Sequence, residues 1–249
     1  MKAEQNLKIL SYNIHKGFSL ANQKYILDLI KKSIQNTNAD LLCLQEVCGS
    51  IDHRHPKRLH PSQSQFEFLA DGIWPHFSYG KNAAYKKGNH GNAILSRYPI
   101  VYSHNLNLST NRLEKRGLLH VKIEVDKKQP LDVMTAHIDL LEKGRQLQNK
   151  KIYEYIKAVT QAEDSLILAG DFNDWREKQS SSFAVENKLR EAFLEFNNEH
   201  AKTFPSFSPQ LKLDRIYYRN LKIQEATCLR GSPWNKLSDH VPLFASFVF

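Results

Sequence analysis

A strand-like pattern ends in acidic and amide side chains at LILAGDFN, residues 166–173. The apolar run 166–169 is short and is followed by Gly170, as expected for a buried β-strand. Asp171 and Asn173 come directly after it. Their side chains are therefore predicted to stand at the end of a rigid strand, beside a loop with room for a substrate.

Other polar residues of the same kind lie at or beside predicted strand ends, namely Asn13, Glu46, His137, Asp214, Asp239 and His240. Each alone has an ordinary explanation. Asp171 could cap a turn, His137 could be a hydrogen-bonded core histidine, and Asp214 could pair with the neighbouring Arg215. Their joint occurrence at strand ends favours a catalytic site, because carboxylates, amides and imidazoles are what a metal-assisted hydrolase needs.

The bulk composition is that of an ordinary globular protein. The chain has 249 residues, 41% of them hydrophobic, so a single domain over residues 1–249 is expected. The formal net charge of +9 is equally compatible with a polyanionic partner and with simple solubility. Three cysteines, no signal-peptide pattern and no apolar run near the ~20 residues of a membrane span predict a cytoplasmic protein.

Strand and helix patterns alternate along the chain. Helices are predicted at 24–34, after an N-cap at Ser62, at 144–161 and at 183–196. Four strands, at 91–96, 101–108, 118–125 and 131–137, follow one another quickly, as in antiparallel pairing. The remaining strands are predicted at 7–13, 40–46, 166–171, 214–219, 221–229 and 241–249. This order suggests two packed sheets flanked by helices.

Two basic segments remain open to interpretation. Residues 53–60 contain three histidines, but Pro56 and the crowded positive charge favour a solvated loop facing an anionic substrate over a metal site. Residues 79–87 alternate tyrosine and lysine, which suits either base stacking with phosphate contacts or plain surface charge.

The ordered motifs resemble the endonuclease/exonuclease/phosphatase superfamily, and small bacterial members in particular. They are NIH at 13–15, LQE at 44–46, GNAILS at 91–96, TAH at 135–137, GDFN at 170–173, LDRI at 213–216 and SDH at 238–240. The resemblance spans nearly the whole chain, from residue 7 to residue 249. It implies an α/β fold with four layers, in which two mixed sheets pack face to face between helices.

The resemblance also implies a metal centre and a reacting water. Glu46, oriented by Asn13, would bind a catalytic Mg²⁺, with Mn²⁺ as an alternative. Asp239 would contribute to the same centre. Asp171 would activate or position the attacking water, and Asn173 would hold that water and contact the phosphate. Oxygen ligands of this kind suit Mg²⁺.

The remaining roles concern charge on the phosphate. By the same resemblance, His240 would hydrogen-bond a non-bridging oxygen, and Asp214 would fix its ring. His137 would stabilise developing charge or assist the leaving group, and Arg116 is a candidate additional cation. Fixed cationic donors are effective where negative charge builds up.

His137 separates this chain from the apurinic endonucleases, which usually carry a tyrosine motif at that stage. The residues before Asp214 also lack the tryptophan-cysteine pair of inositol 5-phosphatases. The expected function is therefore a Mg²⁺-dependent hydrolase of phosphate esters, in particular a phosphodiesterase, with nucleic acid as a candidate substrate. A phospholipid or small-metabolite phosphodiesterase or phosphatase is the alternative, and a catalytically weak binding module of the same fold is a third hypothesis. A monomer is expected.

Overall fold

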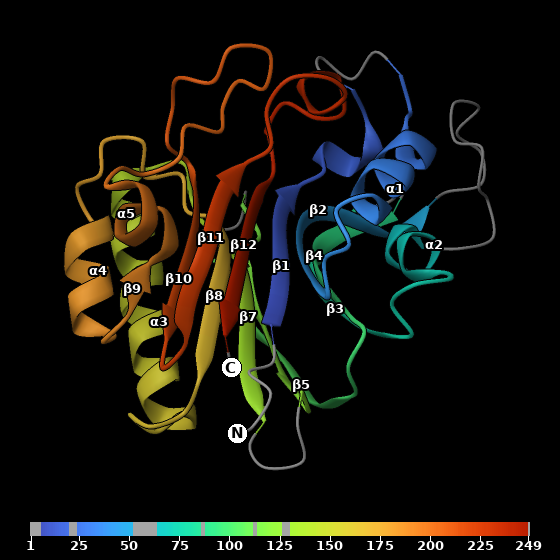
Figure 1. Cartoon of the computed structure of the whole chain (residues 1–249). Helices are drawn as coiled ribbons and strands as arrows, with labels where there is room; N and C mark the ends of the chain where they lie inside the picture. The colour runs from blue at the N-terminus through green and yellow to red at the C-terminus, as the bar shows by residue number, and fades with distance from the viewer. Residues whose placement is uncertain are drawn as a thin grey trace.

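The computed structural model describes residues 6–19, 24–51, 64–85, 88–111, 114–125 and 130–248. Within these residues the strands form two six-stranded mixed sheets. The sheets pack face to face with helices outside, which confirms the predicted α/β sandwich (Figure 1).

The first sheet has the strand order β11-β12-β1-β2-β4-β3. Its only parallel pair is β1 with β2, and the other described pairs are antiparallel. The strands are β1 (Asn6–Asn13), β2 (Leu41–Ile51), β3 (His76–Tyr85), β4 (Gly88–Ser96), β11 (Lys222–Cys228) and β12 (Leu243–Val248).

The second sheet has the order β5-β6-β7-β8-β10-β9. Here β7 and β8 are parallel, and the other described pairs are antiparallel. The strands are β5 (Ile100–Asn107), β6 (Gly117–Ile123), β7 (Leu131–His137), β8 (Leu166–Asp171), β9 (Arg190–Glu191) and β10 (Asp214–Arg219).

Helices cover the outer faces of both sheets. Buried residues of α1 (Leu27–Gln35) and α2 (Gln65–Ala70) pack on the first sheet, and those of α3 (Glu142–Val159) and α4 (Ser180–Glu186) pack on the second. α5 (Ala192–Asn197) packs against β10 and β11. Two short 3-10 turns, η1 (His15–Gly17) and η3 (Trp234–Lys236), complete the described helices. No described helix has the length and apolarity required to cross a membrane.

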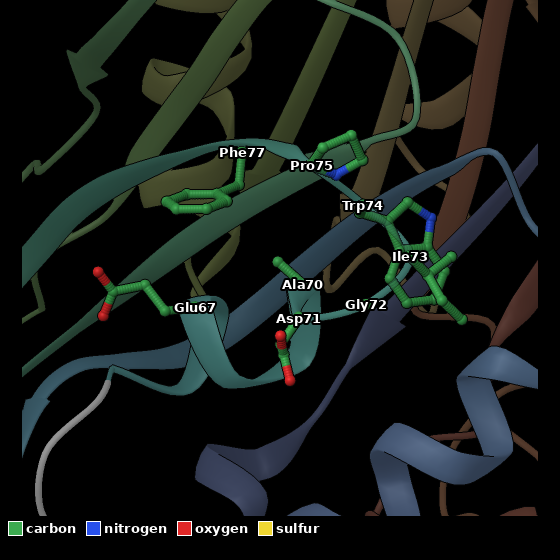
Figure 2. Close-up of a pocket in the computed structure, with 8 residues that line it drawn as sticks. All are labelled: Glu67, Ala70, Asp71, Gly72, Ile73, Trp74, Pro75 and Phe77. Carbon is green, nitrogen blue, oxygen red and sulfur yellow. The ribbon is translucent and has the colours of Figure 1, made fainter.

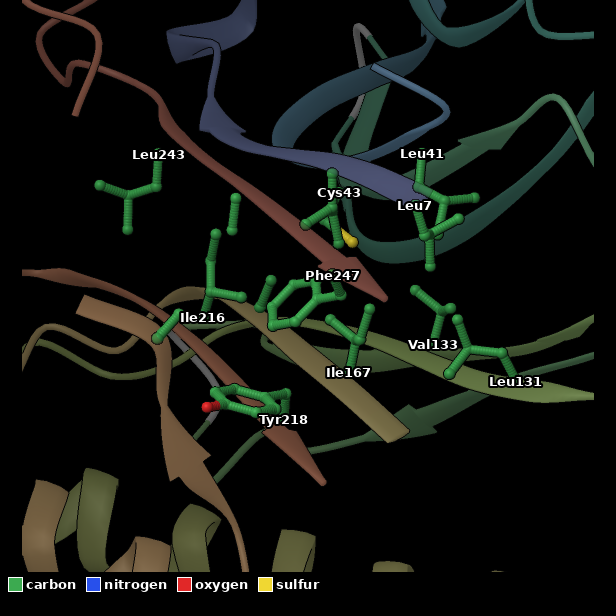
Figure 3. Packing of buried hydrophobic residues seen from close by; sticks show 14 of the residues in the cluster. Leu7, Leu41, Cys43, Leu131, Val133, Ile167, Ile216, Tyr218, Leu243 and Phe247 are labelled. Carbon is green, nitrogen blue, oxygen red and sulfur yellow. The ribbon is translucent and has the colours of Figure 1, made fainter. Parts of the chain in front are cut away.

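The main core lies between the two sheets (Figure 3). In β1, Leu7 and Ile9 face this core, while Leu10 and Tyr12 pack beneath the outer helices. Side chains of a strand alternate between the two faces of a sheet, so a strand covered on both faces is apolar throughout. This explains why most predicted strands read as continuous hydrophobic runs.

Some predicted elements were wrong. Residues 183–196 are not one helix, because α4 ends before Asn187 and Lys188 has a positive φ of 54°, which leads into the short strand β9. β4 does not pair with β5 but with β2 and β3, and β3 itself was not predicted. The N-cap of α2 is Ser64, which forms a reciprocal capping box with Glu67. Ser62, the predicted cap, lies outside the described residues.

Buried polar side chains join the two sheets. Gln45 of β2 donates from Nε2 to Thr135 Oγ1 of β7 at 2.8 Å. Asn92 of β4 donates from Nδ2 to the Gly117 carbonyl oxygen at 2.9 Å and to the Thr135 carbonyl oxygen at 3.3 Å. Because buried polar groups are costly when unpaired, these bonds fix how the sheets meet at one end.

A surface depression of about 730 Å³ lies between α2 and the start of β3 (Figure 2). Glu67, Asp71, Ile73, Trp74 and Phe77 are among the residues that line it, and none belongs to the predicted site. Its two carboxylates would repel a phosphate, so the depression is a poor candidate for the substrate site.

The backbone of β8 is constrained immediately before Asp171. Gly170 has φ +148°, and a Cβ there would lie 1.9 Å from the carbonyl oxygen of Ala136 on β7. Gly72 has φ +87°, but a Cβ there would meet nothing within 4 Å. We expect Gly72→Ala to lower the free energy of unfolding by about 1–2 kcal/mol through backbone strain alone.

Gly170→Ala adds a collision with backbone to that strain. Its loss in free energy of unfolding should exceed that of Gly72→Ala by about 2 kcal/mol or more. Urea denaturation of both variants measures the difference. Equal stability of the two variants would contradict the close approach of β7 and β8 at this point.

Candidate active site

Three candidate residues lie in one row across the second sheet. His137 at the end of β7 pairs in register with Asp171 at the end of β8, which pairs with Asp214 at the start of β10. β7 and β8 run in parallel while β10 runs antiparallel to β8, so the start of β10 lies at the same edge of the sheet as the ends of β7 and β8. The sheet register alone therefore brings His137, Asp171 and Asp214 to one edge.

Asn13 connects this row to the first sheet. It lies at the end of β1, and its Nδ2 donates to Glu46 Oε1 at 3.3 Å and to Asp171 Oδ2 at 3.2 Å. Glu46 lies in β2 where the pairing with β4 shifts register between Leu44 and Val47, and its φ is +56°. The bulge turns the Glu46 side chain toward the site, a common use of such irregularities.

His240 is held between two carboxylates. Its Nδ1 lies 2.8 Å from Asp214 Oδ2, the contact expected from the sequence, and its Nε2 lies 3.7 Å from Asp171 Oδ2. His137 approaches the same oxygen of Asp171, with Nε2 at 3.5 Å. The two imidazoles and Asp171 thus form one cluster at the edge of the sandwich.

The loop that carries Asp239 and His240 is fixed to the rest of the site. Ser238 donates from Oγ to the Asn13 carbonyl oxygen at 2.7 Å, and its Oγ accepts the His240 N–H at 3.3 Å. Asp239 lies on the exposed side, with its Oδ1 3.9 Å from His15 Nδ1. The motif at 238–240 therefore contacts both sheets, through Asn13 of β1 and through Asp214 of β10.

Asn173 holds the turn after β8. Its N–H donates to Asp171 Oδ1 at 3.1 Å, and its Nδ2 donates to the Ile138 carbonyl oxygen at 3.0 Å. Its φ of +50° is a conformation that asparagine tolerates better than most residues. The amide side chain is thus bonded to the neighbouring loop, which fixes the Asp171 carboxylate.

Burial and neighbouring charges set the protonation states of Asp171 and His240. Burial, reinforced by the nearby charge of Asp214, raises the pKa of Asp171 to about 6. Burial works to lower the pKa of His240, but the carboxylates of Asp214 and Asp171 outweigh it and raise that pKa to about 10. Near neutral pH, His240 is a cation beside a mostly ionised Asp171.

Glu46 and His137, in contrast, both have lowered pKa values. Burial alone would raise the pKa of Glu46, but the Lys16 cation and the Asn13 amide help to lower it to about 2. Burial and then the charge of Arg116 hold the pKa of His137 well below 6.5, so its ring is neutral. Arg116 itself lies 3.6 Å from Glu114 and directly precedes Gly117, which pairs in register with His137, so it lies beside the site.

Two sets of residues could bind a metal ion. Ligand atoms of Asp171, Asp214 and His240 all lie within 4.8 Å of one another. However, one nitrogen of His240 already bonds Asp214, and this set mixes nitrogen with oxygen. Glu46 offers carboxylate oxygens next to the Asn13 amide, and Asp239 is connected to the Asn13 backbone through the Ser238 hydroxyl. Such oxygen ligands suit a hard divalent cation better. The Lys16 Nζ, 3.4 Å from Glu46 Oε2, shows that positive charge is stabilised there.

Several basic groups around this centre are not among the site residues predicted from the sequence. His15 and Lys16 follow β1 in η1, where both have positive φ values, and they face Asp239 and Glu46. The charges of Lys16 and Glu46 both act on His90 of β4. In the sequence, only their positions hint at a role: His15 and Lys16 closely follow Asn13, and His90 directly precedes the GNAILS motif at 91–96. The basic loop at 53–60, as well as Lys86 and Lys87, lie outside the described residues.

The Endonuclease/Exonuclease/phosphatase family profile matches residues 10–240, the span that contains all of these side chains. The chain belongs to this family. Its members include phosphodiesterases and phosphatases, among them enzymes that act on nucleic acids.

Three similar proteins illustrate the range. An uncharacterised Escherichia coli protein, YbhP, is 41% identical over 96% of this chain and 95% of its own length. D. rerio TDP2, solved with a single-strand DNA product, has a TM-score of 0.73 and 15% identity, covering 99% of this chain and 100% of that one. A mannosyl-6-phosphatase of Bacteroides thetaiotaomicron has a TM-score of 0.71 and 18% identity, covering 98% and 100%. The two structures share the fold with this chain.

The Asp214–His240 pair makes a prediction about pH. The folded-state pKa of His240 is raised to about 10 from an ordinary 6.5, so protonation stabilises the fold fully below about pH 6.5 and this contribution disappears as the pH rises toward 10. Asp214→Asn removes a principal cause of the shift. In chelator-treated protein, the free energy of unfolding should fall more between pH 7 and pH 10 in the wild type than in Asp214→Asn.

Urea titrations at several pH values measure these slopes. Glu154→Gln, on the exposed face of α3, serves as the control and should follow the wild type. Parallel pH profiles for Asp214→Asn and the wild type would show that Asp214 does not set the protonation of His240.

Proposed function

We propose that the protein is a divalent-metal-dependent hydrolase of phosphate esters, and specifically a phosphodiesterase. The observation that carries this proposal is the amide of Asn13, which bonds Glu46 and Asp171 at once. A group suited to a metal ion and a group suited to activating water are thereby held side by side. Such fixed positioning is the main requirement of phosphoryl transfer.

Glu46 and Asp239 would hold the ion, Mg²⁺ or alternatively Mn²⁺, with Asn13 orienting Glu46. The bound ion would supply positive charge next to the phosphate. The low pKa of Glu46, about 2, supports this role, because its carboxylate is ionised and needs no deprotonation before binding a cation.

Asp171 would take the proton of the attacking water. Its two oxygens are oriented by the Asn173 N–H and by Asn13 Nδ2. A pKa of about 6 leaves it ionised at neutral pH yet still basic enough to accept a proton. His240, kept protonated and fixed in orientation by Asp214, would donate from Nε2 to a non-bridging phosphate oxygen.

His137 and Arg116 would act on the leaving group of the phosphate ester. The neutral His137 ring can donate one hydrogen bond to charge that develops on the leaving oxygen. Arg116, whose charge reaches His137, would add positive potential there. A binding module without catalysis is the weaker alternative, because burying these carboxylates and histidines together has no evident structural benefit.

Nucleic acid is one candidate substrate, supported by the net charge of +9 and by the structural similarity to D. rerio TDP2, which was solved with a single-strand DNA product. A phospholipid or small metabolite is the second. We propose a monomeric, cytoplasmic enzyme. A metal-supplemented screen of plasmid DNA, RNA, phospholipids and chromogenic phosphodiesters discriminates between these substrate classes.

Metal dependence is the first prediction from this mechanism. Chelation with EDTA should abolish hydrolysis of a chromogenic phosphodiester, because Glu46 and Asp239 would lose their cation. Adding Mg²⁺ or Mn²⁺ should restore it, as measured by the release of nitrophenol. Full activity after exhaustive chelation would overturn the assignment.

Charge-removing variants are the second prediction. Glu46→Gln and Asp171→Asn keep the side-chain shape, so both should fold, but each should lower turnover by at least about 100-fold. The exposed Glu154→Gln is the matched control and should keep wild-type turnover. Near-normal kinetics of either site variant would reject the role given to that residue.

A further inference from the structure

Exposed apolar side chains lie in the loops at the edge of the sandwich that carries the proposed catalytic centre. Leu140 and Leu141, in the loop after β7, are 59% and 69% exposed. Trp175, in the loop after β8, is 45% exposed, and Phe207, in the loop before β10, is 63% exposed. We call these four residues the apolar rim. The loops that carry them leave the same edge of the sheet as His137, Asp171 and Asp214 (Figure 1).

Hydrogen bonds fix the backbone of the loop that carries Leu140 and Leu141. Asp139 accepts the Leu141 N–H through Oδ1 at 2.8 Å, and its own N–H donates to Gln148 Oε1 at 2.7 Å. The buried Arg145 donates from Nη1 to the Leu140 carbonyl oxygen at 2.5 Å. These bonds hold the backbone of the two leucines in the conformation that exposes their side chains.

The tryptophan loop is anchored in a similar way. The buried Asp174 accepts the N–H groups of Gln179 and Ser180 through Oδ2, both at 3.0 Å. The Arg176 guanidinium lies 4.3 Å from the centre of the Trp175 ring, which stabilises the exposed indole and adds a cation beside it.

Phe207 belongs to a loop that touches the proposed metal site. The preceding residue, Ser206, donates its N–H to the Asp239 carbonyl oxygen at 2.7 Å and its Oγ to the Ser238 carbonyl oxygen at 2.6 Å. Lys212 of the same loop pairs with Glu177 at 2.7 Å and so ties this loop to the one that carries Trp175. The rim and the polar centre are therefore parts of one surface.

We propose that the apolar rim docks the site onto an anionic phospholipid bilayer, so that a lipid phosphate ester reaches the catalytic centre. The inference rests on the proposed phosphodiester hydrolysis. In a bilayer the phosphate lies at the boundary between water and hydrocarbon. A polar centre with apolar side chains around it matches that boundary, with leucine and aromatic groups entering the interface while the centre meets the headgroup.

The composition of the rim favours lipid over nucleic acid. Trp175 and Phe207 suit a base or a lipid interface equally, so the two leucines decide. Leucine side chains cannot stack on bases, and a phosphate backbone is contacted by donors and cations rather than by aliphatic groups. The exposed Lys143 and Arg176 flank the rim, whereas Lys178 pairs with Glu142 at 3.1 Å, and the chain carries a net charge of +9. Positive charge beside apolar groups is what attracts a protein to anionic headgroups.

Tryptophan fluorescence provides a direct test. Of the three tryptophans, Trp74 and Trp234 are 1% and 9% exposed, so Trp175 is the one that vesicles can reach. Vesicles of phosphatidylcholine with phosphatidylglycerol should shift its emission to shorter wavelength, and the protein should float with them. Vesicles of phosphatidylcholine alone should bind more weakly. The absence of both signals with anionic vesicles would overturn the proposal.

A pair of double variants locates the contact. Leu140→Gln/Leu141→Gln should weaken vesicle partitioning by at least about tenfold, because each leucine would lose apolar burial. Val101→Gln/Val185→Gln is the matched control. Both valines are exposed, Val101 lies at the far end of β5, and Val185 precedes Glu186, which lies beside Arg219 at the far end of β10. Circular dichroism melts verify folding. Equal losses in both variants would reject the rim as the docking site.

Two further measurements separate this inference from the proposed function. Asp171→Asn should still bind vesicles, because docking does not need the general base. Hydrolysis of soluble chromogenic diesters without vesicle binding would remove the docking inference and leave the enzyme. If the leucine variant instead lost binding of a labelled single-stranded oligonucleotide while vesicle binding stayed unchanged, nucleic acid would be the ligand of the rim.

Discussion

Thr135 is the point at which the two sheets are locked together. Its hydroxyl accepts a hydrogen bond from Gln45, and its carbonyl oxygen accepts one from Asn92. Gln45 is adjacent to Glu46, and Thr135 lies two residues before His137. Because these polar groups are buried, their partners are obligatory. A sliding motion of one sheet over the other would break them, so these bonds oppose sliding at the site end.

The site itself concentrates charge where water is scarce. Asp171, Asp214 and His240 are almost fully buried, and isolated charges there would be very unfavourable. Each is offset by its neighbours, since His240 lies between the two carboxylates. Removing a single partner leaves the others uncompensated, which makes the cluster act as a unit. The same pairing separates the pKa values of Asp171 and His240 and so gives them different roles.

Much of the fold could be predicted from local pattern. The strand at Leu166–Asp171 was predicted with its full bounds, because a short apolar run ending at glycine has few other interpretations. β3 was missed because its mixture of tyrosine, lysine and small residues lacks a clear period of two. The break in residues 183–196 was missed because the apolar spacing continues through Asn187 and Lys188, where the backbone turns away.

By itself, the sequence determined which residues stand at strand ends, because strand periodicity and turn residues are local properties. It therefore supplied the candidates Asn13, Glu46, Asp171 and Asp214. Only the tertiary structure decided which of them touch. The contact of Asn13 with Asp171 joins residues 158 positions apart and depends on the packing of one sheet on another. The same is true of the apolar rim: exposure of a leucine is decided by what the folded chain leaves uncovered, which no local pattern records.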